Sequence, residues 1–170
     1  MFNDLKVYLL KDYKLTEENL KQLKPLIYDY DEKVLLNDNN YIGVIDNIIV
    51  IYCLIKESYV LVDKKLRYTK NIYNSIYIDP EDLKSKKKND FAYTIINCLY
   101  NMKRNEDKIY KGIGIHFLNK LKETFDLKKI YLSASEVKLF NYYIKNNLKK
   151  TDYFDIDTVN MNYLRRILLL

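Results

Sequence analysis

The chain has 170 residues, of which 48% are hydrophobic and 31% charged, a composition typical of one globular domain and not of a disordered chain. Its longest uninterrupted apolar run, residues 48–55, is too short to cross a bilayer, which excludes a membrane-spanning helix. The first ten residues lack the basic flank and long apolar stretch of a secretory signal. Cys53 and Cys98 lie within apolar runs, as reduced and buried thiols do, so we expect a cytoplasmic protein.

The net charge is +6, and it comes from lysine far more than from arginine. Lys and Arg together number 29, of which only four are arginine: Arg67, Arg104, Arg165 and Arg166. Arginine is the residue that reads bases and binds phosphates in a bidentate way. Its scarcity argues against a basic nucleic-acid-binding domain, an alternative that a steep fall of nucleic-acid affinity with salt would support.

The first half of the chain predicts a strand, a helix and then mostly strands. Residues 5–12 form the expected first strand. Thr16 is the expected N-cap of a helix that Pro25 should kink or end. Residues 41–55 predict a hairpin that turns at Asp46–Asn47.

Two short β-like runs, YVLV and SIYI, follow within residues 58–78, and Asp79–Pro80 then has the pattern of a helix start. The second half predicts strands and helices in alternation. In chain order we expect a strand over 91–100, a polar loop, a helix over 112–126, a strand over 128–135, a helix over 135–148 that Ser135 caps, and two closing strands. This order predicts an α/β fold around a mixed central sheet.

Two of the three glycines in the chain, Gly112 and Gly114, open the predicted helix 112–126. A helix N-terminus presents backbone N–H groups and the positive end of the helix dipole, and glycine lets an anion approach that backbone closely. Lys111 adds a positive charge beside them. We interpret this pair as a diphosphate-binding loop; the alternative is a loop that needs glycine only for a turn.

Residues 111–154 resemble the GNAT superfamily of acyl-CoA-dependent N-acetyltransferases. KGIG at 111–114 resembles the second half of the family's pyrophosphate loop, and KKIYLSAS resembles the strand after the loop's helix. NYYIKNNLKKTDYF at 141–154 resembles the end of the family's next helix. The sequence departs from the family pattern at Ile109, where the family has Arg or Gln, and at Asn147, where it has Gly.

The resemblance implies one N-acetyltransferase-like domain over residues 1–170, with a GNAT-like mixed central sheet flanked by helices and an insertion at 57–90. It also implies that acetyl-CoA is the co-substrate and that the acetyl group passes directly to an acceptor amine. The residues that the resemblance assigns to acetyl-CoA are Leu99 and Tyr100 for the pantetheine arm, and the backbone of Lys111, Gly112, Ile113 and Gly114 for the pyrophosphate. Tyr143 matches the tyrosine that protonates the departing thiolate, and Tyr142 is its neighbouring rival.

Other polar residues have competing interpretations. Glu136 is either a general base or a first-turn residue that complements the helix dipole. His116 either approaches a phosphate or is an exposed helical residue, and Cys98 behaves as a small hydrophobe rather than a nucleophile. One histidine and two separated cysteines support no metal site. A GNAT-fold module that binds CoA or a partner without catalysis is the alternative that Ile109 and Asn147 favour.

A group of carboxylates stands out in this basic chain. Asp29, Asp31 and Glu32 follow the first predicted helix, and in the GNAT fold that segment borders the acceptor groove. We therefore expect the acceptor to carry its amine on a peptide, a protein or another cationic molecule. The alternative is that these carboxylates belong to an ordinary solvated surface.

Overall fold

The computed structural model describes residues 2–27, 29–55, 59–63, 76–78, 93–103, 110–127, 129–155 and 165–170. The chain forms two compact units, each built from two stretches of sequence. Unit 1 comprises Met1–Ile55 and Asn97–Asp126, and unit 2 comprises Lys56–Ile96 and Leu127–Leu170. Strand β6 (Tyr93–Asn101) contributes its first half to unit 2 and its second half to unit 1. That the whole chain is a single functional domain stays a prediction.

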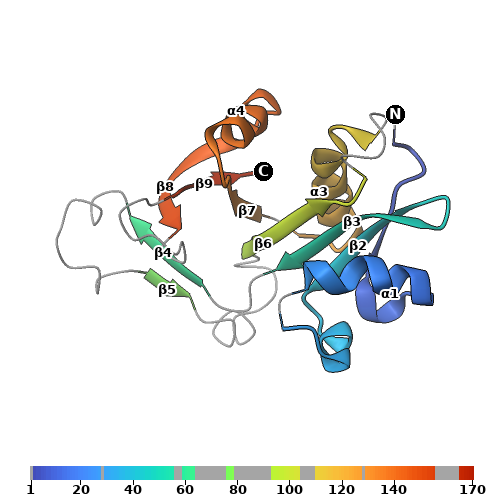
Figure 1. Cartoon of the computed structure of the whole chain (residues 1–170). Coiled ribbons are helices and arrows are strands. Elements are labelled where there is room, and N and C mark those ends of the chain that lie inside the picture. Colours follow the sequence, from blue (N-terminus) through green and yellow to red (C-terminus); the bar gives the residue numbers. More distant parts are fainter. Residues whose placement is uncertain are drawn as a thin grey trace. The chain divides into compact units, whose positions relative to one another are not determined.

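Unit 1 is a sheet in the order β1-β2-β3-β6 with helices packed on it (Figure 1). Its strands other than β6 are β1 (Lys6–Leu9), β2 (Asn40–Ile45) and β3 (Ile48–Ile55), and these three pair in antiparallel fashion. Its helices are α1 (Glu17–Leu23), α3 (Ile113–Thr124) and the short 3₁₀ helices η1 (Leu10–Asp12), η2 (Lys24–Leu26) and η3 (Glu32–Leu36).

The start and the end of α1 are as predicted. The Thr16 hydroxyl accepts a hydrogen bond from Asn19 N at 3.1 Å, and the Asn19 side chain accepts one from Thr16 N at 3.1 Å, which is a capping box. Pro25 ends the α-helix, since the chain tightens there into η2. The first strand is shorter than predicted, because residues 10–12 turn into η1 and bury Leu10 in the core.

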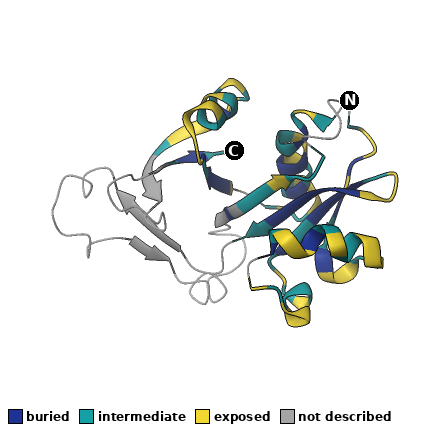
Figure 2. Cartoon of the chain, in the orientation of Figure 1, coloured by how far each residue is buried: buried dark blue, intermediate teal, exposed yellow. Residues whose placement is uncertain are grey.

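The predicted hairpin is confirmed and it forms the centre of unit 1. Asp46 and Asn47 have φ values of 49° and 64°. Positive φ at both central residues is the requirement of the tight hairpin turn whose twist matches that of the two strands. Figure 2 shows these strands buried along most of their length, while the outer surface of α1 is exposed.

Helices α1 and α3 cover opposite faces of this sheet. On one face, Ile42 and Tyr52 share a buried cluster with Leu23 and Ile27 from the α1 end. On the other face, a Cβ atom placed on Gly43 would lie 2.9 Å from Cδ2 of Phe117 in α3. Glycine at this position of β2 therefore allows α3 to lie close to the sheet.

Unit 2 contains the first half of β6 and the strands β4 (Tyr59–Asp63), β5 (Ile76–Ile78), β7 (Lys129–Ser133), β8 (Lys149–Asp155) and β9 (Arg165–Leu169). Strand β6 pairs with β7 in parallel, and the order β7-β9-β8-β4-β5 continues with antiparallel pairs. Strands β4 and β5 confirm the two short runs predicted within 58–78. The helix start predicted at Asp79–Pro80 lies outside the described residues, as does most of the expected insertion at 57–90.

Helix α4 (Val137–Lys145) begins later than predicted. Its N-cap is Glu136, with an extended backbone at φ −148°, and not Ser135. Glu136 is therefore not a first-turn residue either, and its side chain makes no capping hydrogen bond. Within the described part of the chain, no helix has the length and apolar character needed to span a membrane.

Candidate functional site

The glycine pair of the predicted diphosphate loop lies where helix α3 begins. Gly112 is the N-cap and has a left-handed backbone, with φ 84° and ψ 0°. Among the residues that the structure describes, no side chain caps this helix end, and its first turn holds no acidic residue. By contrast, α1 has the Thr16 cap and two glutamates in its first turn. The α3 end thus offers the N–H groups of a helix start to an anion that comes from outside the chain.

Two contacts hold this helix end beside the end of strand β6. A Cβ atom on Gly114 would lie 3.5 Å from Cδ2 of Leu99, so the start of the helix lies close to that side chain. The Asn101 side-chain amide donates a hydrogen bond to the Tyr110 carbonyl at 2.9 Å, which closes the loop between β6 and α3. The structure therefore brings Leu99 together with the glycine loop. The role of Asn101 was not predicted, because an Asn after a strand has the pattern of an ordinary turn residue.

The other residues assigned to acetyl-CoA differ in exposure. Tyr100 is 43% exposed at the end of β6, and Lys111 is exposed. Ile113 is fully buried, so its side chain belongs to the core and only its backbone N–H can contact a ligand. Ile109 lies outside the described residues.

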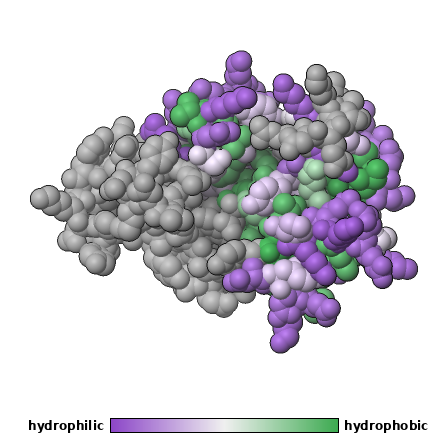
Figure 3. Space-filling view, in the orientation of Figure 1, coloured by the Kyte–Doolittle hydropathy of each residue, from purple (hydrophilic) through white to green (hydrophobic). Residues whose placement is uncertain are grey.

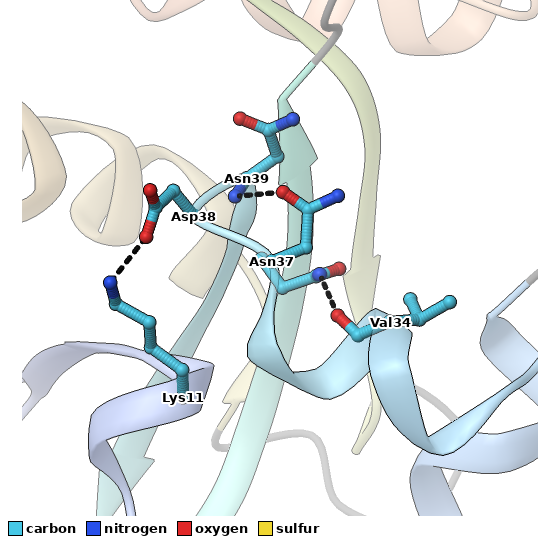
Figure 4. Close-up of polar contacts among 6 residues, drawn as sticks. Lys11, Val34, Asn37, Asp38 and Asn39 are labelled. Carbon is cyan, nitrogen blue, oxygen red and sulfur yellow. Dashed lines mark hydrogen bonds and ion pairs between the residues drawn. The ribbon is translucent and has the colours of Figure 1, made fainter.

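The three carboxylates of the predicted acceptor segment are exposed in the stretch that leads into η3. Asp29 has a φ of 48°, and an Asp31 carboxylate oxygen accepts a hydrogen bond from Lys33 N at 3.3 Å as the cap of η3. Asp38, after η3, forms an ion pair with Lys11, and the hydrogen bond to Asp38 raises the pKa of Lys11 (Figure 4). This segment therefore presents negative charge on a locally fixed backbone.

Tyr143 lies in unit 2, three residues from the C-terminal cap of α4. Leu148 N donates to the Tyr143 carbonyl at 3.2 Å, and Asn147 N donates to the Ile144 carbonyl at 3.1 Å. With Asn147 at φ 68°, these two bonds form a Schellman motif. The residues NYYIKNNL, which resemble the family pattern, therefore form the C-terminal end of α4. Asn147 adopts the left-handed conformation at the position where the family pattern has Gly.

Both candidate tyrosines lie near the C-terminal end of α4, and they differ in burial. Tyr143 is 6% exposed, whereas Tyr142 is half-buried, and burial raises the pKa of Tyr142. The two rings lie 5.7 Å apart between centroids. The protonated phenol is therefore the form that Tyr142 keeps at neutral pH.

The remaining candidates have ordinary structural surroundings. His116 is exposed on the first turn of α3, and Phe2 packs edge-on against its ring at 5.0 Å. Cys53 is fully buried and Cys98 half-buried, and burial raises the pKa of both thiols. A thiol with a raised pKa is a poor nucleophile. The described residues contain no cluster of three or more His, Cys, Asp or Glu that could hold a metal ion.

Comparison with known proteins identifies the fold. No family model matches the chain, and no curated protein matches it either. Among solved structures, a GNAT-family acetyltransferase from Streptococcus agalactiae superposes with a TM-score of 0.55 over 99% of this chain and 96% of that one, at 13% identity. The chain has the GNAT fold. The predicted GNAT-like mixed sheet flanked by helices is thus confirmed.

Other solved GNAT structures match over similar lengths. The N-acetyltransferase YlbP of Bacillus subtilis, in complex with coenzyme A, is 15% identical, with a TM-score of 0.47 over 98% of this chain and 95% of that one. Arabidopsis thaliana Naa50, in complex with a bisubstrate analogue, is 15% identical, with a TM-score of 0.43 over 98% of both chains.

Proposed function

We propose that this protein is an acyl-CoA-dependent N-acetyltransferase. The observation that carries the proposal is the closeness of Leu99 to the start of α3: a Cβ atom on Gly114 would lie 3.5 Å from Cδ2 of Leu99, and Gly112 adopts a left-handed backbone. The strand assigned to the pantetheine arm therefore lies beside the loop assigned to the pyrophosphate. The N–H groups at the start of α3, with Lys111 beside them, suit the two phosphates of acetyl-CoA.

The proposed reaction assigns a task to residues of each unit. The lone pair of the acceptor nitrogen attacks the acetyl carbonyl carbon, so a C–N bond forms while the C–S bond of the thioester breaks. A backbone N–H of β6 stabilises the negative charge that develops on the carbonyl oxygen. Tyr143 donates its phenolic proton to the departing thiolate and regains one from solvent, while the acceptor nitrogen loses its proton to water.

The acceptor in this proposal is an amine on a cationic or extended molecule, such as a peptide, a protein or another cationic amine. Asp29, Asp31 and Glu32 support this choice, because their exposed charges attract a cation in a chain that is otherwise basic. The outer surface of unit 1 is largely hydrophilic on the face that Figure 3 shows. The free cysteines further support a reducing compartment such as the cytoplasm as the place of action.

Binding of acetyl-CoA tests the proposal directly. A ligand that binds only the folded state stabilises it by about 2.7 kcal/mol at a hundredfold excess over its dissociation constant. We expect thermal unfolding to show that shift for the wild type and to lose it for Gly112→Val, since the side chain would occupy the place of the pyrophosphate. Gly112→Asn should also lose the shift. Because Asn tolerates the positive φ of this residue, that loss would not come from a strained backbone.

Asn119→Ala is the matched control on the same helix. Asn119 is exposed in α3 and lies about two turns from the glycine loop, so the fold and the ligand-induced shift should both persist. A wild-type melting curve that saturating acetyl-CoA leaves unchanged would contradict the proposed function.

A further inference from the structure

Asn40, at the start of β2, is the one buried polar residue among those that the structure describes, and its exposed fraction is 0%. Its side-chain amide donates a hydrogen bond to the Val34 carbonyl at 2.9 Å. Its amide oxygen accepts a hydrogen bond from the Tyr52 hydroxyl at 2.6 Å. A buried amide is tolerated only when such bonds replace its bonds to water. The Asn40 side chain therefore joins two separate parts of unit 1, the strand β3 and the helix η3.

On one side of Asn40 lies the segment that carries the acceptor carboxylates. Val34 is in η3, and its carbonyl also accepts a hydrogen bond from Asn37 N at 3.1 Å (Figure 4). The next turn is held by Asn39 N, which donates to the Asn37 side chain at 3.2 Å. The position of η3 on the sheet thus depends on a bond from a side chain inside the core.

On the other side lies the strand assigned to acetyl-CoA. The Tyr52 ring, 1% exposed, stacks on the ring of Tyr100 at 6.4 Å between centroids and 7° between planes. Tyr100 follows Leu99 on β6 and is 43% exposed. A continuous series of contacts therefore leads from Tyr100 through Tyr52 and Asn40 to η3.

We propose that the Asn40–Tyr52 pair positions the acidic segment at η3 relative to the acetyl-CoA strand β6, and so sets the affinity for the acceptor amine. The inference rests on the proposed function and adds two positioning residues to it. Neither side chain is among the residues assigned to the chemistry, and both are buried in the core of unit 1.

The bond between the two residues requires the Tyr52 hydroxyl to keep its proton. Burial raises the pKa of Tyr52, and the neighbouring Cys98, Cys53 and Tyr100 add to that effect. The hydroxyl therefore stays a hydrogen-bond donor throughout the neutral range. Asn40, which has no titratable group, is a fitting partner for such a donor.

Tyr52→Phe removes only the hydroxyl and is the central variant of the test. Hydrogen exchange should become faster at the amides of Val34 and Asn37, which are hydrogen-bonded within or next to η3, while α1 keeps its protection. The KM for the acceptor should rise about tenfold, as for the loss of one buried hydrogen bond, with little change in kcat or in the KM for acetyl-CoA. Tyr8→Phe, in a tyrosine that packs against the same core cluster from β1, should change neither readout.

The double variant Asn40→Leu with Tyr52→Phe separates positioning from stability. Replacing both partners by apolar groups of similar shape should recover much of the stability that Tyr52→Phe loses. If the pair positions η3, exchange at Val34 and the acceptor KM should stay raised in the double variant. Exchange that is unchanged at η3 in Tyr52→Phe, or raised equally in α1, would overturn the inference. A wild type that neither binds acetyl-CoA nor transfers acetyl groups would overturn the proposed function instead, and with it the acceptor role, while exchange still reports on the position of η3.

Discussion

Asn147 and Gly112 show how a single residue fits the backbone conformation that a helix end requires. Both adopt positive φ, at 68° and 84°, one ending α4 and the other starting α3. Few residue types accept a positive φ, so the residue type at each of these positions indicates the backbone conformation of the helix end. The departure from Gly to Asn at 147 therefore leaves the helix end intact.

Tyr143 is the residue on which catalysis depends in the proposed function. Tyr143→Phe should lower kcat by about 10²–10⁴-fold and leave the affinity for acetyl-CoA nearly unchanged, because only the proton donor is lost. Tyr142→Phe, at the neighbouring ring 5.7 Å away, is the matched control and should have a much smaller effect. The measurement is steady-state kinetics with both substrates, beside a thermal melt of each variant. Full turnover by Tyr143→Phe would mean that another residue donates the proton to the departing thiolate.

Asn40 and Tyr52 mark the limit of what single residues reveal in a sequence. Asn40 stands in the run LNDNNYI, which has the composition of an exposed turn, yet it is fully buried. Its partner Tyr52 is one of 18 tyrosines, and nothing in the chain distinguishes it. A hydrogen bond between residues twelve positions apart on different strands has no local pattern, so the structure was needed to find it.

At the scale of elements, patterns predicted the parts that bury a regular apolar face. The hairpin of β2 and β3, its turn at Asp46–Asn47, and helix α3 are confirmed, because their periodicity and turn residues act locally. The predictions were wrong at two element boundaries. Residues 10–12 leave the first strand to bury Leu10, and the chain stays extended through Glu136 before α4 begins.

Gly43 tests how closely α3 must approach the sheet. Gly43→Ala would place a methyl group 2.9 Å from Cδ2 of Phe117 and 3.3 Å from Cβ of Ile51, both fully buried. Overpacking of this kind destabilises a protein by about 1–3 kcal/mol, and the shift of α3 should also weaken acetyl-CoA binding. Chemical denaturation and ligand titration measure the two effects.

Gly114→Ala serves as the comparison within α3 itself. Its methyl group has room beside Leu99, and Ala is about 0.5–1 kcal/mol more favourable than Gly within a helix. The two alanine variants should therefore change stability in opposite directions. Equal stability of Gly43→Ala and the wild type would mean that Phe117 yields easily and that the close packing of α3 is not required.

At the scale of the whole molecule, the fold persists while the sequence diverges. The chain is 13% identical to a GNAT structure that it matches over nearly its full length. A fold depends on the pattern of buried and exposed positions more than on residue identity, so it can be kept at this low identity. The resemblance that predicted it came from the few motifs over 111–154. The acceptor depends instead on charges and shapes that vary within a fold, so it must be tested separately.

Charge distribution over the molecule leads to the prediction about the acceptor. The chain carries a net charge of +6, but Asp29, Asp31 and Glu32 present three exposed carboxylates within four residues. The triple variant Asp29→Asn, Asp31→Asn and Glu32→Gln replaces all three by their amides, which removes the charges with little change in shape. An asparagine side chain also accepts the positive φ at position 29 and caps a helix as well as an aspartate does at position 31.

This triple variant should raise the KM for a cationic acceptor about tenfold at low salt, because each exposed charge contributes up to about 1 kcal/mol to its attraction. The difference from the wild type should shrink as salt screens the charges, while kcat and the KM for acetyl-CoA change little. The matched control is the triple variant Asp4→Asn, Glu123→Gln and Asp126→Asn, which removes the same charge from exposed positions elsewhere in unit 1. Acceptor kinetics that respond equally to both triple variants, or a screen in which only anionic amines are acetylated, would reject a role for this segment in choosing the acceptor and would leave the assignment of acetyl-CoA in place.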